Sequence, residues 1–344
     1  MTAKRLGFFS RLLDQADAGE RYRLATEQIV RAEQLGFDSA WVAQHHFLEA
    51  EGGLPSPFVL LAHVAARTST IRLGTGVVTL PLEQPLRTAE DAAVFDLLTD
   101  GRLELGVGSG GNPFAFPPFG LDNANRTEVY IRHLRTLRAA LRGDALEGSD
   151  AQLYPTRPHL LDRMWQATFS ADGGRWAGME GDGLMLSRSQ PRPAGSPNAS
   201  LADLQLPIID AYLAALPAGR APRILGSRAV FVADDRKEAL HYAGIGLRRN
   251  AERLRSMGRA VRDETLDELI ASTDTHVGTP DEVIASLRAD RTLERVTDLV
   301  FQVHSVDPPH ALILRSIELI AEQVAPALGW KKPVSADRAL EAAQ

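Results

Sequence analysis

Two adjacent histidines are the first residues of this chain whose chemistry suggests a site. They lie in the segment Gln44-His45-His46-Phe47, and an imidazole can donate or accept a proton near neutral pH. Neighbouring side chains on an extended segment point to opposite sides, so the pair is poorly placed to bind one metal ion together. His45 is a candidate for proton transfer, and a hydrogen-bonded loop histidine is the alternative.

Two glycine-rich segments could hold a ligand close to the main chain. Gly74-Thr75-Gly76-Val77 permits unusual backbone angles or the close approach of a flat ligand, and a bulge in a buried strand is the alternative. The turn over residues 106–113 could hold an anion through its backbone N–H groups. It does not match a P-loop, which needs Gly-Lys-Ser/Thr, so a phosphate site there is a weak prediction.

Ser170-Ala171-Asp172-Gly173 forms the fourth segment, a small polar turn that opens a helix after a strand. The first N–H groups of a helix have no partner within the helix, and together with the Ser170 hydroxyl they could bind a phosphate. Ordinary capping of the helix by Ser170 or Asp172 is the alternative.

All four segments follow stretches that are typical of β-strands, and helical patterns separate most of these stretches. The eight predicted strands are 6–9, 39–43, 71–80, 102–107, 164–169, 184–187, 229–232 and 297–303. Predicted helices cover 21–35, 58–67, 85–98, 126–141 and 311–325. A closed (β/α)₈ barrel and an open, doubly wound sheet both fit this alternation.

Composition excludes several other classes of protein. The 344 residues include no cysteine, which removes disulfides, cysteine zinc sites and thiol nucleophiles. The net charge of −6 without a long basic run disfavours nucleic-acid binding. No window is apolar enough for a membrane helix or a secretory signal, so we expect a cytoplasmic protein without a membrane partner. No histidine shows metal-ligand spacing, and no metal site is expected.

The four segments occur together in an order that resembles the bacterial luciferase-like family of flavin-dependent monooxygenases. The likeness is carried by Ala32–Trp41 with His45-His46-Phe47, by Leu73–Pro81, by Pro85–Gly108, and by Gly278-Thr279-Pro280-Asp281-Glu282-Val283. The resemblance implies a (β/α)₈ barrel with a reduced flavin mononucleotide (FMN) at its C-terminal face. It also implies a non-proline cis peptide beside the flavin ring, which we expect between Gly76 and Val77.

The same resemblance implies a set of site residues. His45 matches the first histidine of the family motif and would be the catalytic, proton-handling group. The expected cofactor-binding residues are Phe9, Gly76, Val77, Ser109, Gly110, Ser170, Ala171 and Gly173. Three positions depart from luciferase: Gln44 replaces an acid, Ser109 an arginine that pairs with the phosphate, and Gly108 a reactive cysteine, whose loss should leave more room near the ring.

The implied reaction begins when reduced FMN and dioxygen form a C4a-peroxyflavin, from which one oxygen atom passes to a small organic substrate. A separate flavin reductase and a homodimer are the partners that the resemblance suggests. We expect one barrel domain over residues 1–344, with insertions near 188–200 and 234–276 and a C-terminal tail near 331–344. The substrate cannot be predicted, although Phe114, Phe116 and Phe119 could form an apolar pocket wall or could pack within their own loop.

Three other functions compete with this prediction. A deazaflavin-dependent oxidoreductase of the same superfamily would transfer hydride without activating oxygen, and the His-His-Phe segment favours the FMN enzyme over it. A flavin-binding protein that has lost catalysis is kept open by Gln44 and Ser109. An unrelated barrel hydrolase would need paired carboxylates or a metal cluster at strand ends.

Overall fold

A computed structural model of the chain describes residues 4–193, 195–196, 199–256, 261, 265–303 and 308–331. Within these residues the strands are β1 (Arg5–Ser10), β2 (Ser39–Val42), β3 (Arg72–Thr75), β4 (Val78–Thr79), β5 (Leu103–Gly108), β6 (Met164–Ala167), β7 (Gly183–Leu186), β8 (Ile224–Val232), β9 (Thr275–Gly278) and β10 (Asp298–Gln302). The main helices are α1 (Ala18–Gln34), α2 (Pro57–Ala65), α3 (Pro85–Leu98), α4 (Arg126–Arg142), α5 (Ala171–Met179), α6 (Leu201–Ala215), α7 (Arg236–Ser256), α8 (Leu266–Ser272), α9 (Pro280–Ala289), α10 (His310–Leu319) and α11 (Ala325–Ala327).

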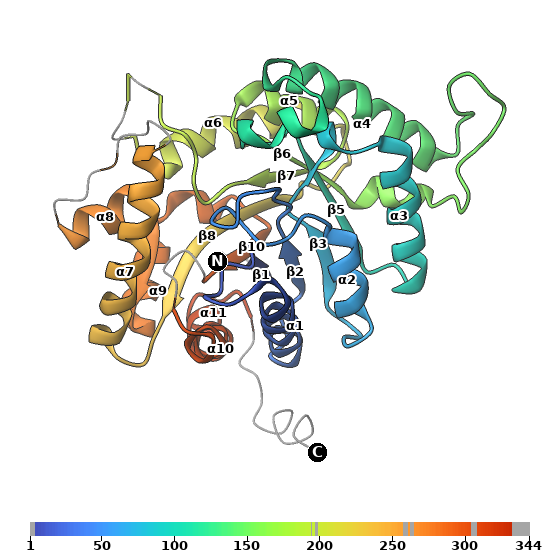
Figure 1. Cartoon of the computed structure of the whole chain (residues 1–344). Helices are drawn as coiled ribbons and strands as arrows, with labels where there is room; N and C mark the ends of the chain where they lie inside the picture. The colour runs from blue at the N-terminus through green and yellow to red at the C-terminus, as the bar shows by residue number, and fades with distance from the viewer. Residues whose placement is uncertain are drawn as a thin grey trace.

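The strands close into a parallel barrel surrounded by helices (Figure 1). Strand order is β1-β2-β3-β5-β6-β7-β8-β10, and β10 pairs with β1 to close the ring. The structure therefore confirms the (β/α)₈ barrel and excludes the open doubly wound sheet. Because all strands run the same way, their carboxyl ends meet at one face, where barrel sites form.

The observed strands differ from the predicted ones in three places. The predicted strand 71–80 is interrupted between β3 and β4, and both pieces pair with β5. Strand β9 was missed because it begins inside the segment 234–276, which was expected to be an insertion; it pairs with the end of β8 outside the barrel ring. Strand β8 also begins at Ile224, five residues before the predicted strand at 229.

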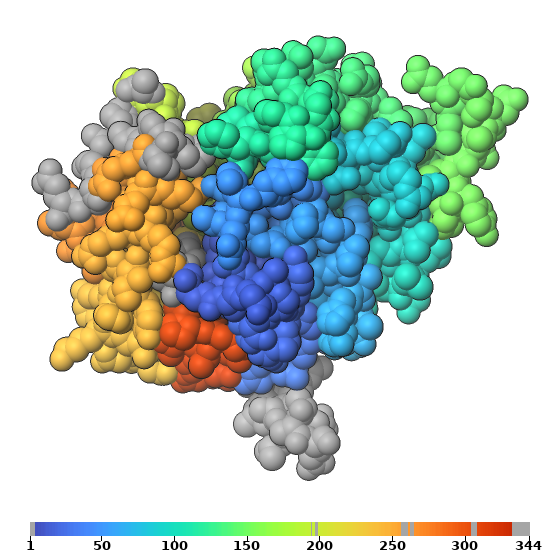
Figure 2. Space-filling model, in the orientation of Figure 1, coloured from blue at the N-terminus to red at the C-terminus, as the bar shows by residue number. Residues whose placement is uncertain are grey.

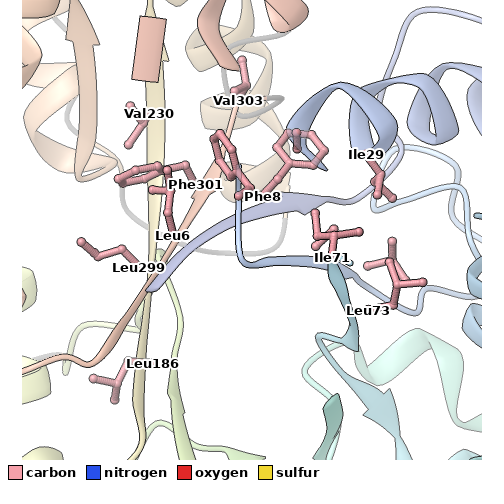
Figure 3. Packing of buried hydrophobic residues seen from close by; sticks show 14 of the residues in the cluster. Leu6, Phe8, Ile29, Ile71, Leu73, Leu186, Val230, Leu299, Phe301 and Val303 are labelled. Carbon is pink, nitrogen blue, oxygen red and sulfur yellow. The ribbon is translucent and has the colours of Figure 1, made fainter. Parts of the chain in front are cut away.

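Side chains alternate along each strand between the outer face of the barrel and its interior. Side chains on the outer face pack against the helices, as Figure 3 shows for Leu6 and Phe8 of β1 and for Leu299 and Phe301 of β10. The inner face carries a smaller cluster that fills the barrel, made of Trp41, Trp165, Met185, Leu225 and Val300. This inner cluster fills the barrel beneath its carboxyl face, so a ligand bound at that face would lie above it.

The α4–β6 connection, which was not expected as an insertion, projects from the surface in Figures 1 and 2. The expected insertion 234–276 contains α7 and α8, which form the opposite flank of the molecule. Residues 194, 197–198, 257–260, 262–264 and 332–344, which include most of the expected tail, lie outside the described residues. None of the described helices combines the length and apolar character needed to cross a membrane.

Candidate functional site

The barrel brings the four candidate segments to one mouth. His45 follows β2, the Gly76-Val77 pair lies between β3 and β4, Gly108 ends β5, and Ser170 follows β6. These strands are consecutive in the ring, so the segments line about half of its carboxyl face. The four segments, distant in sequence, therefore lie together at one face of the barrel and form one candidate site.

Small residues form the floor of this mouth. The peptide bond between Gly76 and Val77 is cis, as expected from the resemblance. A Cβ on Gly76 would lie 2.7 Å from Cε2 of Phe9, and a Cβ on Gly108 would lie 2.9 Å from Cγ2 of Val77 and 3.7 Å from Cβ of Ala167. Phe9, Val77 and Ala167 are half-buried on the inner cluster, so they present a low apolar surface toward the mouth.

Other glycines of the predicted segments make room for the protein's own side chains. A Cβ on Gly74 would lie 2.3 Å from Cε3 of Trp41, and one on Gly110 would lie 2.7 Å from Cγ2 of Thr79. Gly110 also has a φ of +82°, a left-handed conformation that favours glycine. At Gly108, Val77 takes up part of the space that loss of the luciferase cysteine was expected to leave.

The N-terminus of α5 forms one end of the site. The side chain of Ser170 caps this helix by accepting a hydrogen bond from the N–H of Gly173 (3.1 Å), and the first helical bond runs from Gly174 N to Ser170 O (3.0 Å). The N–H groups of Ala171 and Asp172 precede that bond and therefore point out of the helix end. Gly173 leaves room for Thr168, whose Oγ1 would lie 2.0 Å from a Cβ there.

His45 lies on the other side of the mouth among charged groups. Its Nδ1 is 4.0 Å from Oε2 of Glu51, and a Cβ on Gly52 would lie 2.6 Å from its Cδ2. Burial, helped by the guanidinium groups of Arg11 and Arg253, lowers the pKa of His45 to about 3. The imidazole is therefore neutral at physiological pH, with one ring nitrogen able to donate a hydrogen bond and the other able to accept one.

Three arginines near His45 were missed by the sequence analysis. Arg11 and Arg253 both contact Glu51, and Arg188 donates a hydrogen bond from Nε to Oε1 of Gln302 (2.8 Å). Arg11 and Arg188 stand one and two residues past the ends of β1 and β7, so a search for charged residues at strand ends could have found them. Arg253 lies within α7, where no local pattern sets it apart.

Gln44, which replaces an acid of the family motif, holds the adjacent strand. Its Oε1 accepts from the N–H of Thr79 (2.7 Å), while its Nε2 donates to Oε1 of Glu83 (2.5 Å) and to the carbonyl of Pro55 (3.1 Å). These contacts fix β4 against the segment after β2. These hydrogen bonds of Gln44 are structural, and the charged groups near His45 are Arg11 and Glu51.

Aromatic side chains connect the β5–α4 loop with the histidine segment. The ring of Phe119 lies 5.0 Å from His46 and 5.6 Å from Phe47, measured between centroids. Phe116 is buried with Leu82 and Ala115, so it packs within the loop region, whereas Phe114 is exposed. The three phenylalanines therefore have three different environments, and Phe119 is the one that contacts the histidine segment.

A model of the luciferase-like monooxygenase family matches residues 7–294. Among curated proteins, the chain is 33% identical to the 4-hydroxyprotoasukamycin monooxygenase of Streptomyces nodosus subsp. asukaensis over 274 residues, covering 74% of this chain and 73% of that one. It is 37% identical to the uncharacterised protein y4vJ of Sinorhizobium fredii over 173 residues, and this match spans 49% of that protein and 48% of this chain.

Solved structures share the fold over nearly the whole chain. The monooxygenase RslO1 of Streptomyces bottropensis superposes with a TM-score of 0.77 at 25% identity, covering 94% of this chain and 99% of that one. The oxygenating constituent of 3,6-diketocamphane monooxygenase of Pseudomonas putida, solved with FMN, has a TM-score of 0.70 at 22% identity and covers 94% and 98%. The coenzyme F420-dependent tetrahydromethanopterin reductase of Methanopyrus kandleri, with a TM-score of 0.66 at 18% identity, covers 95% and 99%. The fold alone therefore does not choose between FMN and F420.

Proposed function

Because the chain belongs to the luciferase-like monooxygenase family, we propose that it is an FMN-dependent monooxygenase that oxygenates a small organic substrate. The observation that carries the proposal is the shape of the mouth. A floor of Gly76, Val77, Gly108 and Ala167 lies between the N-terminus of α5 and the imidazole of His45. A flat ring with a phosphate at one end and a reacting edge at the other matches this order of features.

The residues present fit the two parts of FMN. Phe9 and Val77, which pack against Gly76 and Gly108, would offer an apolar surface to the ring system. The N–H groups of Ala171 and Asp172, with the Ser170 hydroxyl, would receive the phosphate at the helix N-terminus. Ser109 and Gly110 follow β5 and would complete the phosphate end, with hydroxyl and backbone groups in place of an arginine.

Reduced FMN, when bound, would supply the electrons that activate dioxygen, so that one oxygen atom enters the substrate and the other leaves as water. The protein would orient the ring and limit access of water. Phe47 and Phe119 are in contact with each other at the edge of the mouth and could cover it. Neutral His45 would accept a proton at its ring nitrogen, and Glu51, 4.0 Å from Nδ1, would favour the charged form as it develops.

Anaerobic stopped-flow mixing tests this function. Protein loaded with reduced FMN is mixed with oxygenated buffer, and the return of oxidised-flavin absorbance is recorded. We expect a delayed phase, slower than the oxidation of free FMN, whose rate changes at least about tenfold in His45→Ala. His241→Ala, which alters an exposed histidine on α7, serves as the control and should leave the delayed phase unchanged.

Oxidation at the rate of free FMN would contradict the proposal. A deazaflavin-dependent hydride transfer would then be the leading alternative, and binding of reduced F420 by the same protein would test it. A flavin-binding protein without catalysis would bind FMN tightly, yet release oxidised flavin without a delayed phase. The three functions therefore give three different results with one preparation of protein.

We also propose two partners for this enzyme. A separate flavin reductase would supply reduced FMN, and addition of a purified reductase with NADH should then support turnover. A homodimer would cover the apolar side chains that α2 and α3 expose, among them Val59 (71% exposed), Val94 (45%) and Leu98 (75%). Light scattering at several protein concentrations would contradict the dimer if the mass stays that of one chain.

A further inference from the structure

Three guanidinium groups converge on the His45 side of the mouth from elements far apart in the sequence. Arg11 follows β1, Arg188 follows β7, and Arg253 comes from α7, which lies beside β8 in Figure 1. We call these residues the arginine cluster. The side chains of Arg11 and Arg253 are 11% and 24% exposed, so both are partly removed from water.

Within the described part of the chain, Glu51 is the carboxylate that contacts this cluster. Arg11 approaches Oε2 of Glu51 at 3.6 Å and also donates to its main-chain carbonyl, while Arg253 contacts Oε1. Arg253 donates from Nη2 to Oδ1 of Asn250 as well (3.1 Å). These contacts hold two of the three guanidinium groups in position around one negative charge.

Arg188 is different, because it has no ion pair with any described residue. Its side chain donates from Nε to the neutral amide of Gln302, the last residue of β10. Burial and the like charges of Arg11 and Arg253 lower its pKa to about 9. Burying the charge of Arg188 beside other cations, with a neutral hydrogen-bond partner, costs free energy. Binding of an oxyanion would lower that cost, because its negative charge would pair with the guanidinium.

We propose that the arginine cluster binds a carboxylate, or an oxyanion of the same shape, carried by the organic substrate, with Arg188 as the principal contact. This inference rests on the proposed function for the position of the flavin. A guanidinium presents paired N–H donors that match the two oxygens of a carboxylate. With its acidic end held there, the rest of a small substrate would extend past His45 toward the floor at Gly76 and Val77.

Strand order argues against the phosphate of FMN as the ligand of this cluster. The helix N-terminus at Ser170 follows β6, which lies four places from β1 in the ring of eight strands. Arg11 follows β1. Arg188 follows β7, the neighbour of β6, but its side chain points to Gln302 on β10, the strand next to β1. The two candidate anion sites therefore lie across the mouth from each other, as a cofactor phosphate and a substrate carboxylate would.

Calorimetric binding of benzoate and its neutral isostere benzamide tests the proposal. Both probes are titrated into protein loaded with oxidised FMN, at low chloride because chloride competes for guanidinium groups. We expect benzoate to bind at least about tenfold more tightly than benzamide, and Arg188→Met to remove that preference. Arg142→Met, which alters a half-exposed arginine paired with Asp144 on the outer surface, is the matched control and should bind benzoate as the wild type does.

Equal binding of the two probes to the wild type would overturn the proposal, and this comparison decides even if Arg188→Met fails to fold. Benzoate affinity that survives in a folded Arg188→Met protein would overturn it as well. Competition between benzoate and FMN for flavin-free protein would assign the cluster to the cofactor instead. Because these titrations need no turnover, Arg188-dependent benzoate binding would stand even if the oxygenase experiment fails.

Discussion

The two sides of the barrel mouth are lined by different kinds of residue. The glycine side, made of Gly76, Val77, Gly108, Ala167 and Ser170, presents backbone groups and short side chains to the ligand that we propose. The arginine side, made of Arg11, His45, Glu51, Arg188 and Arg253, is lined by long side chains that end in charges. The glycine side therefore presents small residues, and the arginine side presents charged groups.

This difference separates two kinds of ligand recognition. The glycine side would select for shape, since Gly76 and Gly108 pack so closely against Phe9 and Val77 that one added Cβ would lie within 3 Å of them. Charge held by a scaffold selects for an anion whatever the shape of its remainder. If the two sides act independently, substitutions on one side should change flavin binding, and substitutions on the other should change binding of an acidic ligand.

The largest expected effect comes from filling the floor on the glycine side. In Gly108→Leu the new side chain must displace Val77, and its remaining atoms would take the space proposed for the flavin ring. We expect the dissociation constant for FMN to rise about 100-fold, which corresponds to about 3 kcal/mol of lost binding free energy. Quenching of flavin fluorescence on binding measures the change.

Gly195→Leu is the matched control, because Gly195 is exposed and a Cβ on it meets nothing within 4 Å. It should bind FMN as the wild type does. Benzoate affinity of flavin-free Gly108→Leu should stay unchanged if the two sides are separate. An equal loss of FMN and benzoate binding would show that the mouth responds as one unit, and it would break the comparison.

A pH-dependent effect of intermediate size is expected on the arginine side. The folded-state pKa of His45, about 3, lies below the ordinary value of 6.5. Between these two values the unfolded chain binds more protons than the folded one, so stability falls as the pH falls. At pH 5 the loss amounts to about 2 kcal/mol relative to neutral pH. His45→Gln should lack this component in denaturant titrations at the two pH values.

The charged groups that face His45 determine how much stability is lost at pH 5. Arg11, Arg188, Arg253 and His46 disfavour its charged form, and Glu51 favours it. Arg188→Met should therefore raise the pKa of His45 and reduce the loss of stability at pH 5. His241→Gln, at an exposed position on α7, should retain the full wild-type loss. A wild-type protein with the same pH dependence as His45→Gln would show that the arginines do not act on His45.

Sequence could predict the glycine side because its parts are local. Each of its segments is a short motif directly after a strand, and the order of these motifs indicated the family and the barrel that joins them. The arginine side is assembled from positions 11, 51, 188 and 253, and no motif links residues so far apart. The interruption after β3 and the extra strand β9 were missed for a related reason, because they depend on pairing with β5 and β8.

The smallest expected effect tests whether the helix N-terminus on the glycine side receives a phosphate. Ser170→Ala removes the cap of α5 and the hydroxyl that would contact the phosphate. A charge-assisted hydrogen bond is worth about 1.5 kcal/mol, so we expect FMN to bind about tenfold more weakly while riboflavin, which has no phosphate, binds as before.

Ser200→Ala removes an equivalent cap from α6, where Ser200 accepts from Asp203 N at 3.1 Å, and it controls for the loss of helix stability alone. If Ser170→Ala weakens the binding of FMN and riboflavin equally, Ser170 has only a structural role, and the phosphate is bound elsewhere. Should the phosphate prove to depend on Arg188, the two sides of the mouth would exchange their roles.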